Sequence, residues 1–115
     1  MLAPGGHHMV VEKSGKIVLN QNPLVCGVRP SVDVTMESVA QAYGAATRAV
    51  VLTGMGSDGT TGAALIRKAG GEVVVEHEST CAVYGMPRSI VESGNANKIV
   101  PLSEVAEEII RMCSR

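Results

Sequence analysis

The 115-residue sequence contains no tryptophan and no phenylalanine, and Tyr43 and Tyr84 are its only tyrosines. Valine, isoleucine, leucine, methionine and alanine must therefore fill its core. These side chains bury less area than the large aromatics, and burial stabilises by roughly 25 cal/mol per Å² of apolar surface. A chain of this length can bury one core with little to spare. We expect a single domain of modest stability.

Cysteine pairs, clustered charge and long apolar runs are also missing. Cys26, Cys81 and Cys113 are odd in number and form no C-x-x-C pair, which favours free thiols in the cytoplasm. Lysine and arginine are scattered and the formal net charge is −1, so nothing indicates a nucleic-acid-binding surface. No apolar run approaches the ~20 residues of a membrane helix, and Met1–Gly6 lacks the regions of a signal peptide. We expect a cytoplasmic protein that binds neither nucleic acid nor membrane.

The first 44 residues predict a hairpin followed by a helix. Two β-type runs, 9–12 and 16–19, flank Ser14-Gly15, and Gly15 can take the positive φ of a tight turn. Ser31 can cap a helix that ends near Gly44. The apolar positions of that helix keep the i, i+4, i+7 rhythm: Val32, Met36, Val39, Ala40 and Tyr43.

The rest of the chain alternates strands and helices. Residues 49–53 are continuously apolar, which is typical of a parallel strand buried on both faces. A helix over about 60–69 and a strand at 72–76 complete a βαβ unit. A short helix with Pro87 in its first turn, a strand at 98–100 and a last helix follow. That last helix is expected to be capped by Ser103, with one apolar face: Val105, Ile109 and Met112.

These elements predict an α/β fold. We expect a doubly wound, mostly parallel, Rossmann-like sheet preceded by a β-hairpin. Neither an internal repeat nor a linker interrupts the sequence, so residues 1–115 are expected to belong to one domain.

A glycine loop, Gly54–Gly59, joins the strand and the helix of the βαβ unit and matches the G-x-G-x-x-G pattern of dinucleotide-binding proteins. Glu76 ends the next strand, where such proteins carry the acid that binds a ribose. Asp58 argues against this interpretation, because its carboxylate would meet a pyrophosphate at the helix N-terminus. Two like charges ~4 Å apart repel by about 4 kcal/mol at an effective dielectric constant of ~20.

Asp58 itself allows two other interpretations. It lies outside the carboxyl end of a parallel strand, where open α/β sheets place their sites. There a carboxylate can orient a histidine and stabilise the imidazolium formed when that histidine takes a proton from a serine. Alternatively, Asp58 caps the helix that starts at Gly59-Thr60. Its spacing alone is compatible with either role.

Four segments of the sequence resemble the motifs of a known family. Ala3–Met9 (APGGHHM), Arg29–Asp33 (RPSVD), Gly54–Gly59 (GMGSDG) and Tyr84–Arg88 (YGMPR) occur in this order. They resemble the CheB-type protein-glutamate methylesterases of chemotaxis, and the similarity runs from Leu2 to about Met112. The resemblance implies that residues 1–115 are a single partial domain, the C-terminal part of a methylesterase catalytic domain.

The resemblance also implies a function. Enzymes of this family hydrolyse glutamyl methyl esters on methyl-accepting chemotaxis receptors, and often deamidate receptor glutamines, by acyl transfer to a serine without cofactor or metal. Asp58 matches the aspartate of their Ser-His-Asp triad, and Met55 with Gly56 matches residues that border the site. The implied partners are the receptors, the N-terminal remainder of the enzyme and its receiver domain.

Two parts of the family's machinery do not occur in these 115 residues. The serine of a G-x-S-x-G-G loop and the histidine of a Q-H-M-type segment are both missing, and Ser57 beside Asp58 is not the family's nucleophile. The chain alone is therefore not expected to be active.

Two alternative functions stay open: a dinucleotide-binding domain, and a non-catalytic fragment that only binds a partner. Without the neighbouring strand, residues 49–53 are expected to form a sheet edge through which the chain associates with itself, unless the N-terminal hairpin folds over that edge.

The remaining polar candidates favour plainer roles. His7, His8 and His77 lack the spacing of a zinc site, and we expect no metal. His8 is expected to pack in a loop or at the rim of the site, and Arg29 to brace a loop or face solvent. Cys81 has no basic neighbour and is not expected to be a nucleophile. Three carboxylates of the last helix are expected on a solvated face: Glu104, Glu107 and Glu108.

Overall fold

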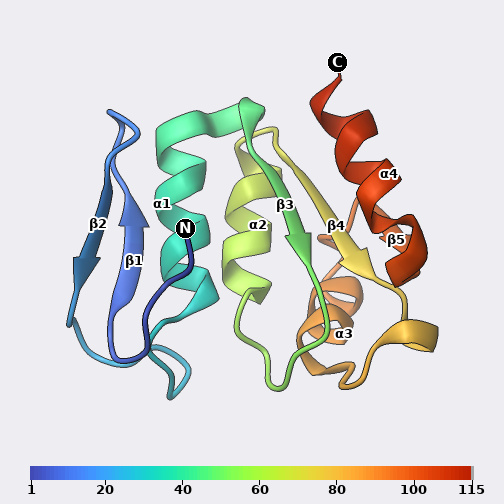
Figure 1. Ribbon diagram of the computed structural model, residues 1–115, viewed down its shortest axis with the longest axis horizontal. Helices are drawn as coiled ribbons and strands as arrows, with labels where there is room; N and C mark the ends of the chain where they lie inside the picture. The colour runs from blue at the N-terminus through green and yellow to red at the C-terminus, as the bar shows by residue number, and fades with distance from the viewer. Residues whose placement is uncertain (115) are drawn as a thin grey trace.

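The computed structural model describes residues 1–114 as a parallel sheet with helices on both faces, beside a separate hairpin (Figure 1). Two short 3-10 turns, η1 (Gly44–Ala46) and η2 (Glu78–Thr80), connect elements. The remaining elements are β1 (His8–Val11), β2 (Ile17–Asn20), α1 (Val32–Tyr43), β3 (Arg48–Val51), α2 (Thr60–Lys68), β4 (Glu72–Glu76), α3 (Gly85–Glu92), β5 (Lys98–Val100) and α4 (Leu102–Cys113). Among these residues, no helix is both long and apolar enough to cross a bilayer.

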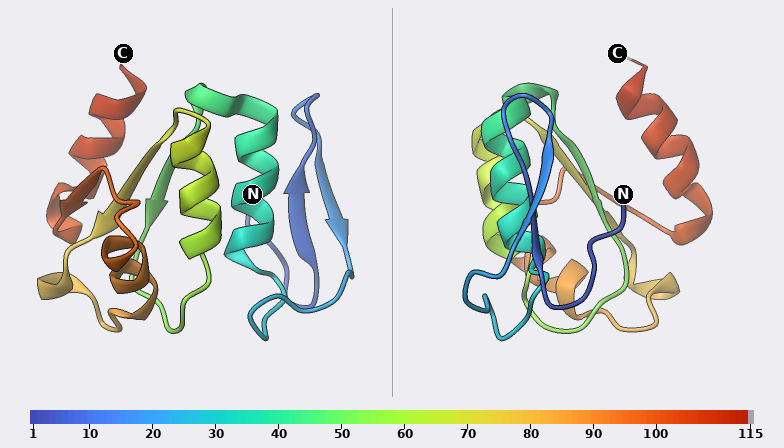
Figure 2. Two further views of the ribbon diagram at one scale, coloured as in Figure 1. Left: turned by 180° about the vertical axis from the view of Figure 1, so that it is seen from behind. Right: turned by 60° about the vertical axis from the view of Figure 1, so that its left-hand side comes forward.

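The sheet has the order β3-β4-β5, and both of its strand pairs are parallel. Val73, Val74 and Val75 of the central strand β4 are fully buried. Val73 and Val75 pack in the cluster built with α1, α2 and α3, whereas Val74 packs with Val105 and Met112 of α4. Figure 2 shows α1 and α2 on one face of the sheet and α4 on the other. The doubly wound α/β arrangement is confirmed.

The hairpin forms a two-stranded sheet of its own, with Met9 aligned to Leu19 and Gly15 at a φ of 88° in the turn. It packs on α1, where the Val11 N–H donates to the Ser38 hydroxyl group at 2.9 Å. The hairpin therefore does not pair with β3, which in the described residues pairs only with β4. Only Val51 of β3 is buried. Burial on both faces, expected of 49–53, is a property of β4 instead, because β3 is an edge strand.

The two helices α1 and α2 approach most closely at Gly62 of α2. A Cβ atom at this position would lie 2.5 Å from Cβ of Met36 and 3.2 Å from Oδ1 of Asp33, both in α1. Real Cβ atoms do not come so close to a neighbour, so only glycine permits this helix contact. The contact brings the N-termini of the two helices together, and those N-termini form the site described below.

We predict that Gly62→Ala lowers the free energy of unfolding by about 1–3 kcal/mol, the usual cost of overpacking. In a helix free of contacts the same substitution would stabilise by about 1 kcal/mol, because alanine is the better helix former. Urea unfolding measures the difference. Thr61→Ala, at the exposed neighbouring position, is the matched control and should change stability by no more than about 0.5 kcal/mol. A stabilised Gly62→Ala protein would contradict the close contact.

The last helix departs from expectation at both its start and its buried face. Pro101, not Ser103, is the N-cap residue of α4. Val105 and Met112 are buried as expected, but Ile109 is 41% exposed and Glu108 takes the inward position. The expectation of a solvated Glu108 is wrong because two cations accompany it. Its carboxylate accepts hydrogen bonds from Lys98 Nζ of β5 at 2.9 Å and from Arg111 of the next turn. Glu104 and Glu107 are exposed, as expected.

Hydrogen bonds from Arg111 and then Lys98 lower the pKa of Glu108 to about 2, from an ordinary value of about 4.5. Since the folded-state pKa lies below the unfolded one, the carboxylate stabilises the fold above about pH 4.5 and loses this effect as the pH falls toward 2. We predict that Glu108→Gln is less stable than the wild type at neutral pH and that the difference shrinks through this window. Urea unfolding across the pH range measures it. Glu107→Gln should show no such pH-dependent difference, and a constant difference for Glu108→Gln would contradict the assignment.

Candidate active site around Asp58

The glycine loop between β3 and α2 is held by the segment that precedes and starts α3. The Gly54 N–H donates to the Val83 carbonyl, and the Met86 N–H donates to the Gly54 carbonyl, both at 2.9 Å. A Cβ atom on Gly85 would lie 2.8 Å from the backbone nitrogen of Gly56, so glycine is required for this contact. The structure therefore brings Gly54–Gly59 and Tyr84–Arg88 together at the carboxyl ends of β3 and β4 (Figure 1).

Asp58 lies in this loop, 8% exposed, and its carboxylate meets the N-terminus of α1. Oδ1 accepts a hydrogen bond from the Ser31 hydroxyl group at 2.8 Å and one from the Asp33 N–H at 2.9 Å. Oδ2 accepts a hydrogen bond from the Val32 N–H at 2.6 Å. The donors come from residues more than twenty positions earlier in the chain. The Asp58 carboxylate therefore satisfies N–H groups at the start of α1 that a helix cannot satisfy by itself.

The helix that Asp58 caps is therefore α1, and the expectation that it caps the helix at Gly59-Thr60 is wrong. Gly59, the N-cap residue of α2, has a φ of 99° and no side-chain cap. Instead, Oδ1 of Asp33 accepts hydrogen bonds from the N–H groups of Gly59 at 3.0 Å and Gly62 at 2.7 Å. The two helices thus exchange carboxylates: Asp58, just before α2, caps α1, and Asp33, in the first turn of α1, caps α2.

Ser31 takes part in this exchange in an unexpected way. It is the N-cap residue of α1, as the sequence indicates, but its side chain makes no cap hydrogen bond to its own helix. Its hydroxyl group donates to Asp58 instead. The cause is that the buried Asp58 carboxylate already accepts from the first N–H groups of α1, which a capping serine would otherwise satisfy.

Both carboxylates lie at helix N-termini, where the backbone dipoles favour negative charge. Burial raises the pKa of Asp33, and the negative charge of Asp58 raises it further, while hydrogen bonds from the N–H groups of Gly62 and Gly59 act in the opposite direction. The N–H groups that a phosphate would use at α2 are therefore occupied by Asp33. Glu76, 1% exposed, accepts a hydrogen bond from the Thr53 N–H at 2.8 Å and is not free to reach a ribose. These contacts argue against dinucleotide binding.

His8 braces Ser31 from the hairpin side. It is 1% exposed, and both ring nitrogens have partners. Nδ1 accepts a hydrogen bond from the Ser31 N–H at 3.2 Å, and Nε2 lies 2.9 Å from the Pro23 carbonyl. These partners assign the proton to Nε2. Of the two expected roles, His8 therefore has the packing role, and it links Ala3–Met9 to Arg29–Asp33.

The other polar candidates lie apart from Asp58. Nη1 of Arg29 donates to the carbonyls of Gln21 and Asn22, so Arg29 braces its own loop. Nδ1 of His77, an exposed residue, accepts a hydrogen bond from the Ser79 N–H. Burial raises the pKa of the Cys81 thiol, and the nearby Glu76 carboxylate adds to the rise, which is the opposite of what a nucleophilic thiol needs.

The structure brings together one set of metal-ligand types that the sequence analysis did not consider. In residues 1–114, Cys26, Asp33 and Asp58 place a sulfur and two carboxylate oxygens within 4.8 Å of one another. These carboxylates already accept five hydrogen bonds from N–H and O–H donors. Backbone N–H groups and the Ser31 hydroxyl group thus occupy acceptor positions that a cation would otherwise use.

Met55 and Gly56 form the tip of the glycine loop. The Met55 side chain is 82% exposed, and Gly56 has a φ of 86°. Both lie between β3 and Asp58, at the carboxyl end of the sheet. Their expected role at the border of a site stays a prediction.

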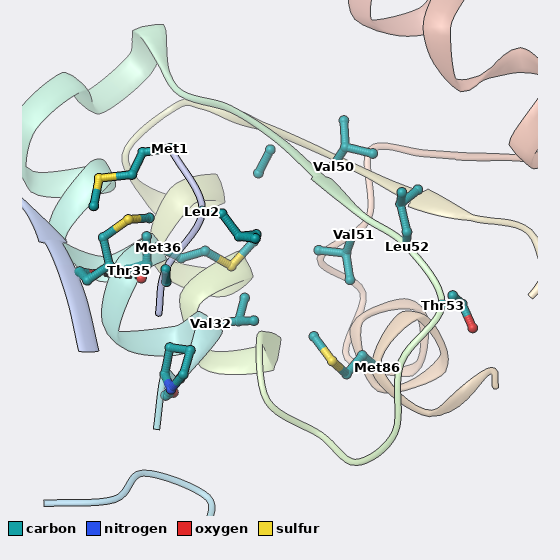
Figure 3. A pocket seen from close by; sticks show the side chains of 15 residues that line it. Met1, Leu2, Val32, Thr35, Met36, Val50, Val51, Leu52, Thr53 and Met86 are labelled. Carbon is teal, nitrogen blue, oxygen red and sulfur yellow. Dashed lines mark hydrogen bonds between the residues drawn. The ribbon is translucent and has the colours of Figure 1, made fainter. Parts of the chain in front are cut away.

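An apolar groove of about 530 Å³ runs beside the free edge of β3 (Figure 3). No pattern in the sequence indicates this groove, because its walls come from segments distant in sequence. Its lining includes Leu2, Val32, Met36, Val51, Leu52 and Met86. Ser31 and Val32, two of the residues that hold Asp58, also line the groove. An apolar surface along a strand edge therefore shares residues with the cluster around the buried carboxylate.

Comparison with known proteins agrees with this arrangement. The profile of the family described as CheB methylesterase matches residues 1–109. A protein-glutamate methylesterase/protein-glutamine glutaminase of Symbiobacterium thermophilum is 51% identical over 111 residues, which are 96% of this chain and 31% of that protein. A similarly named protein of Pseudomonas aeruginosa is 45% identical over 118 residues, covering 100% of this chain and 34% of that protein.

A solved structure shares the fold. The crystal structure of the Thermotoga maritima CheB methylesterase catalytic domain superposes with a TM-score of 0.90 at 39% identity, covering 95% of this chain and 59% of that one. The chain thus spans about a third of the length of the curated relatives and somewhat more than half of that catalytic domain. With its four motifs joined in one hydrogen-bonded cluster, the chain belongs to the CheB methylesterase family.

Proposed function

We propose that residues 1–115 are one partial domain, the C-terminal part of a methylesterase catalytic domain, and that they supply Asp58 as the aspartate of a Ser-His-Asp triad. The reaction is the hydrolysis of protein glutamyl methyl esters, together with the deamidation of glutamines. The observation that supports this most directly is the buried Asp58 carboxylate, held by three donors at the carboxyl end of β3.

Such a carboxylate suits the third position of a triad. In acyl transfer, a histidine removes the proton of a serine as the serine attacks the ester carbonyl, and then returns a proton to the leaving alcohol. The aspartate holds the imidazole in one tautomer and stabilises the imidazolium. Asp58 meets these needs because its oxygens are already oriented by Ser31, Val32 and Asp33, so little reorganisation is needed when the histidine arrives. Met55 and Gly56, at the loop tip, border this site.

The partners follow from the same proposal. The serine and the histidine come from the N-terminal remainder of the enzyme, and the substrates are methyl-accepting chemotaxis receptors in the cytoplasm. A receiver domain controls the enzyme. The groove beside β3 is the surface on which the remainder of the catalytic domain packs, since it is apolar and is lined in part by residues that hold Asp58.

An uncovered strand edge and groove also predict self-association of the isolated chain. Light scattering at micromolar concentration should report a dimer or a larger species. Leu52→Lys, at a groove position that is 40% exposed, should shift the chain toward monomer. Val51 is unsuitable for this test, because it is 4% exposed and a lysine there would unfold the core.

Ile110→Lys is the control for self-association, because Ile110 is 65% exposed on α4 and does not line the groove. That variant should associate as the wild type does. A wild-type chain that stays monomeric at high concentration would contradict the expected role of the β3 edge.

The triad role is tested in an active methylesterase that contains residues 1–115, such as a chimera with the remainder of the Thermotoga maritima catalytic domain. The chain alone should hydrolyse methylated receptor no faster than buffer. In the active enzyme, Asp58→Asn should lower kcat by about 10⁴, as the corresponding change does in another Ser-His-Asp triad.

The control must account for the stability that Asp58→Asn loses at the helix cap. The NH2 group of asparagine cannot accept a hydrogen bond, so one donor is left unsatisfied at a cost of about 1–3 kcal/mol. Glu76→Gln is a matched exchange of a buried carboxylate outside this cluster, and it should keep kcat within about threefold. Thermal unfolding must show that both variants are folded at the assay temperature. A folded Asp58→Asn enzyme with more than a tenth of wild-type kcat would contradict the proposal, as would an inactive wild-type assembly.

A further inference from the structure

The carboxylate of Asp58 has more protein donors than a helix cap requires. An ionised carboxylate has about four acceptor positions, two on each oxygen. Oδ1 uses both of its positions, for the Ser31 hydroxyl group and the Asp33 N–H. Oδ2 uses one, for the Val32 N–H. Within the described residues, one acceptor position is left, and it is on Oδ2.

We infer that Ser31 is a positioning residue of the site: its hydroxyl group fills the last acceptor position on Oδ1, so that only Oδ2 of Asp58 can receive the N–H of the triad histidine. This inference rests on the proposed function, since it concerns how Asp58 performs that role. It assigns a part in the reaction to a serine that neither attacks the substrate nor touches the histidine.

The Ser31 side chain is well suited to fix one orientation. The residue is 0% exposed. Its N–H donates to Nδ1 of His8, whose Nε2 bonds the Pro23 carbonyl, so the Ser31 backbone is held from the hairpin side. Its hydroxyl group then points to Asp58 at 2.8 Å. A continuous hydrogen-bonded path therefore runs from Pro23 through His8 and Ser31 to the carboxylate.

The two backbone donors cannot replace the hydroxyl group. The N–H groups of Val32 and Asp33 each hold a different oxygen, so they fix the position of the carboxylate but leave one open acceptor position on each side. Without the Ser31 hydroxyl group, Oδ1 would keep only the Asp33 N–H, and the plane of the carboxylate would be less firmly fixed. The imidazole bound to Oδ2 would then have more than one orientation, and only one directs its other nitrogen at the serine. A misplacement of this kind lowers kcat and leaves KM nearly unchanged.

The test uses the active methylesterase described above. Ser31→Ala should lower kcat by about 10- to 100-fold, with KM within about threefold of the wild type, because the hydroxyl group acts on orientation and not on receptor binding. Ser31→Thr keeps the hydroxyl group and should recover most of kcat. Ser31→Cys keeps the shape of the side chain, with a slightly larger sulfur that donates weakly, and its kcat should lie between those of the alanine variant and the wild type.

Ser38→Ala is the matched control. Ser38 lies in the same helix, and its hydroxyl group accepts from the Val11 N–H at 2.9 Å and donates to the Thr35 carbonyl at 2.7 Å, without contact to Asp58. It should lose thermal stability comparable to that of Ser31→Ala and keep wild-type kcat. Proton NMR gives a second readout that does not depend on turnover. The low-field resonance of the histidine N–H bonded to Asp58 should be single in the wild type and shifted or broadened in Ser31→Ala.

The outcomes separate this inference from the proposed function. If Asp58→Asn abolishes turnover while folded Ser31→Ala and Ser31→Cys retain wild-type kcat and an unchanged resonance, the inference is wrong and the triad role stands. Equal losses of kcat in Ser31→Ala and Ser38→Ala would mean that Ser31 affects turnover only through the stability of the fold, and the inference would then be wrong too. If Asp58→Asn retains wild-type kcat, the proposed function itself fails.

Discussion

The exchange of carboxylates between α1 and α2 is the interaction on which the rest of this structure depends. Asp58 accepts from the first N–H groups of α1, and Asp33 accepts from those of α2. Each helix thus provides the cap of the other, which requires their N-termini to lie side by side. Gly62 permits that approach, because any larger side chain would collide with Met36. The close helix contact and the buried acids are parts of one arrangement.

Two buried acids so close together would ordinarily be unfavourable, since desolvation and mutual repulsion both disfavour their charged forms. Here the compensation comes from backbone N–H groups, the Ser31 hydroxyl group and the two helix dipoles. Burial and the negative charge of Asp58 still raise the pKa of Asp33 above its ordinary value. Such fixed dipoles do not need to reorient when charge develops nearby, which is the property that a triad aspartate needs.

Capping and catalysis are therefore compatible roles for Asp58. The sequence presented them as alternatives, but the Asp58 carboxylate caps α1 and still lies at the carboxyl end of β3. Three accepted hydrogen bonds leave an acceptor position on Oδ2 for one more donor. Ser31 and Val32 also line the groove beside β3, so the edge of the sheet and the buried carboxylate share neighbours.

The sequence by itself determined the family, the α/β class and most element positions. The strands at 72–76 and 98–100 have their expected limits, Gly15 lies in the hairpin turn and Gly44 ends α1 as expected, because these features depend on neighbours along the chain. Only the tertiary structure decided which helix Asp58 caps, that Glu108 lies inside with Lys98, and that the hairpin packs on α1 instead of pairing with β3. Rules for caps and helix faces assume partners within a few residues. The donors to Asp58 lie more than twenty residues away, and no periodicity in the sequence records a contact that forms only when two helices pack.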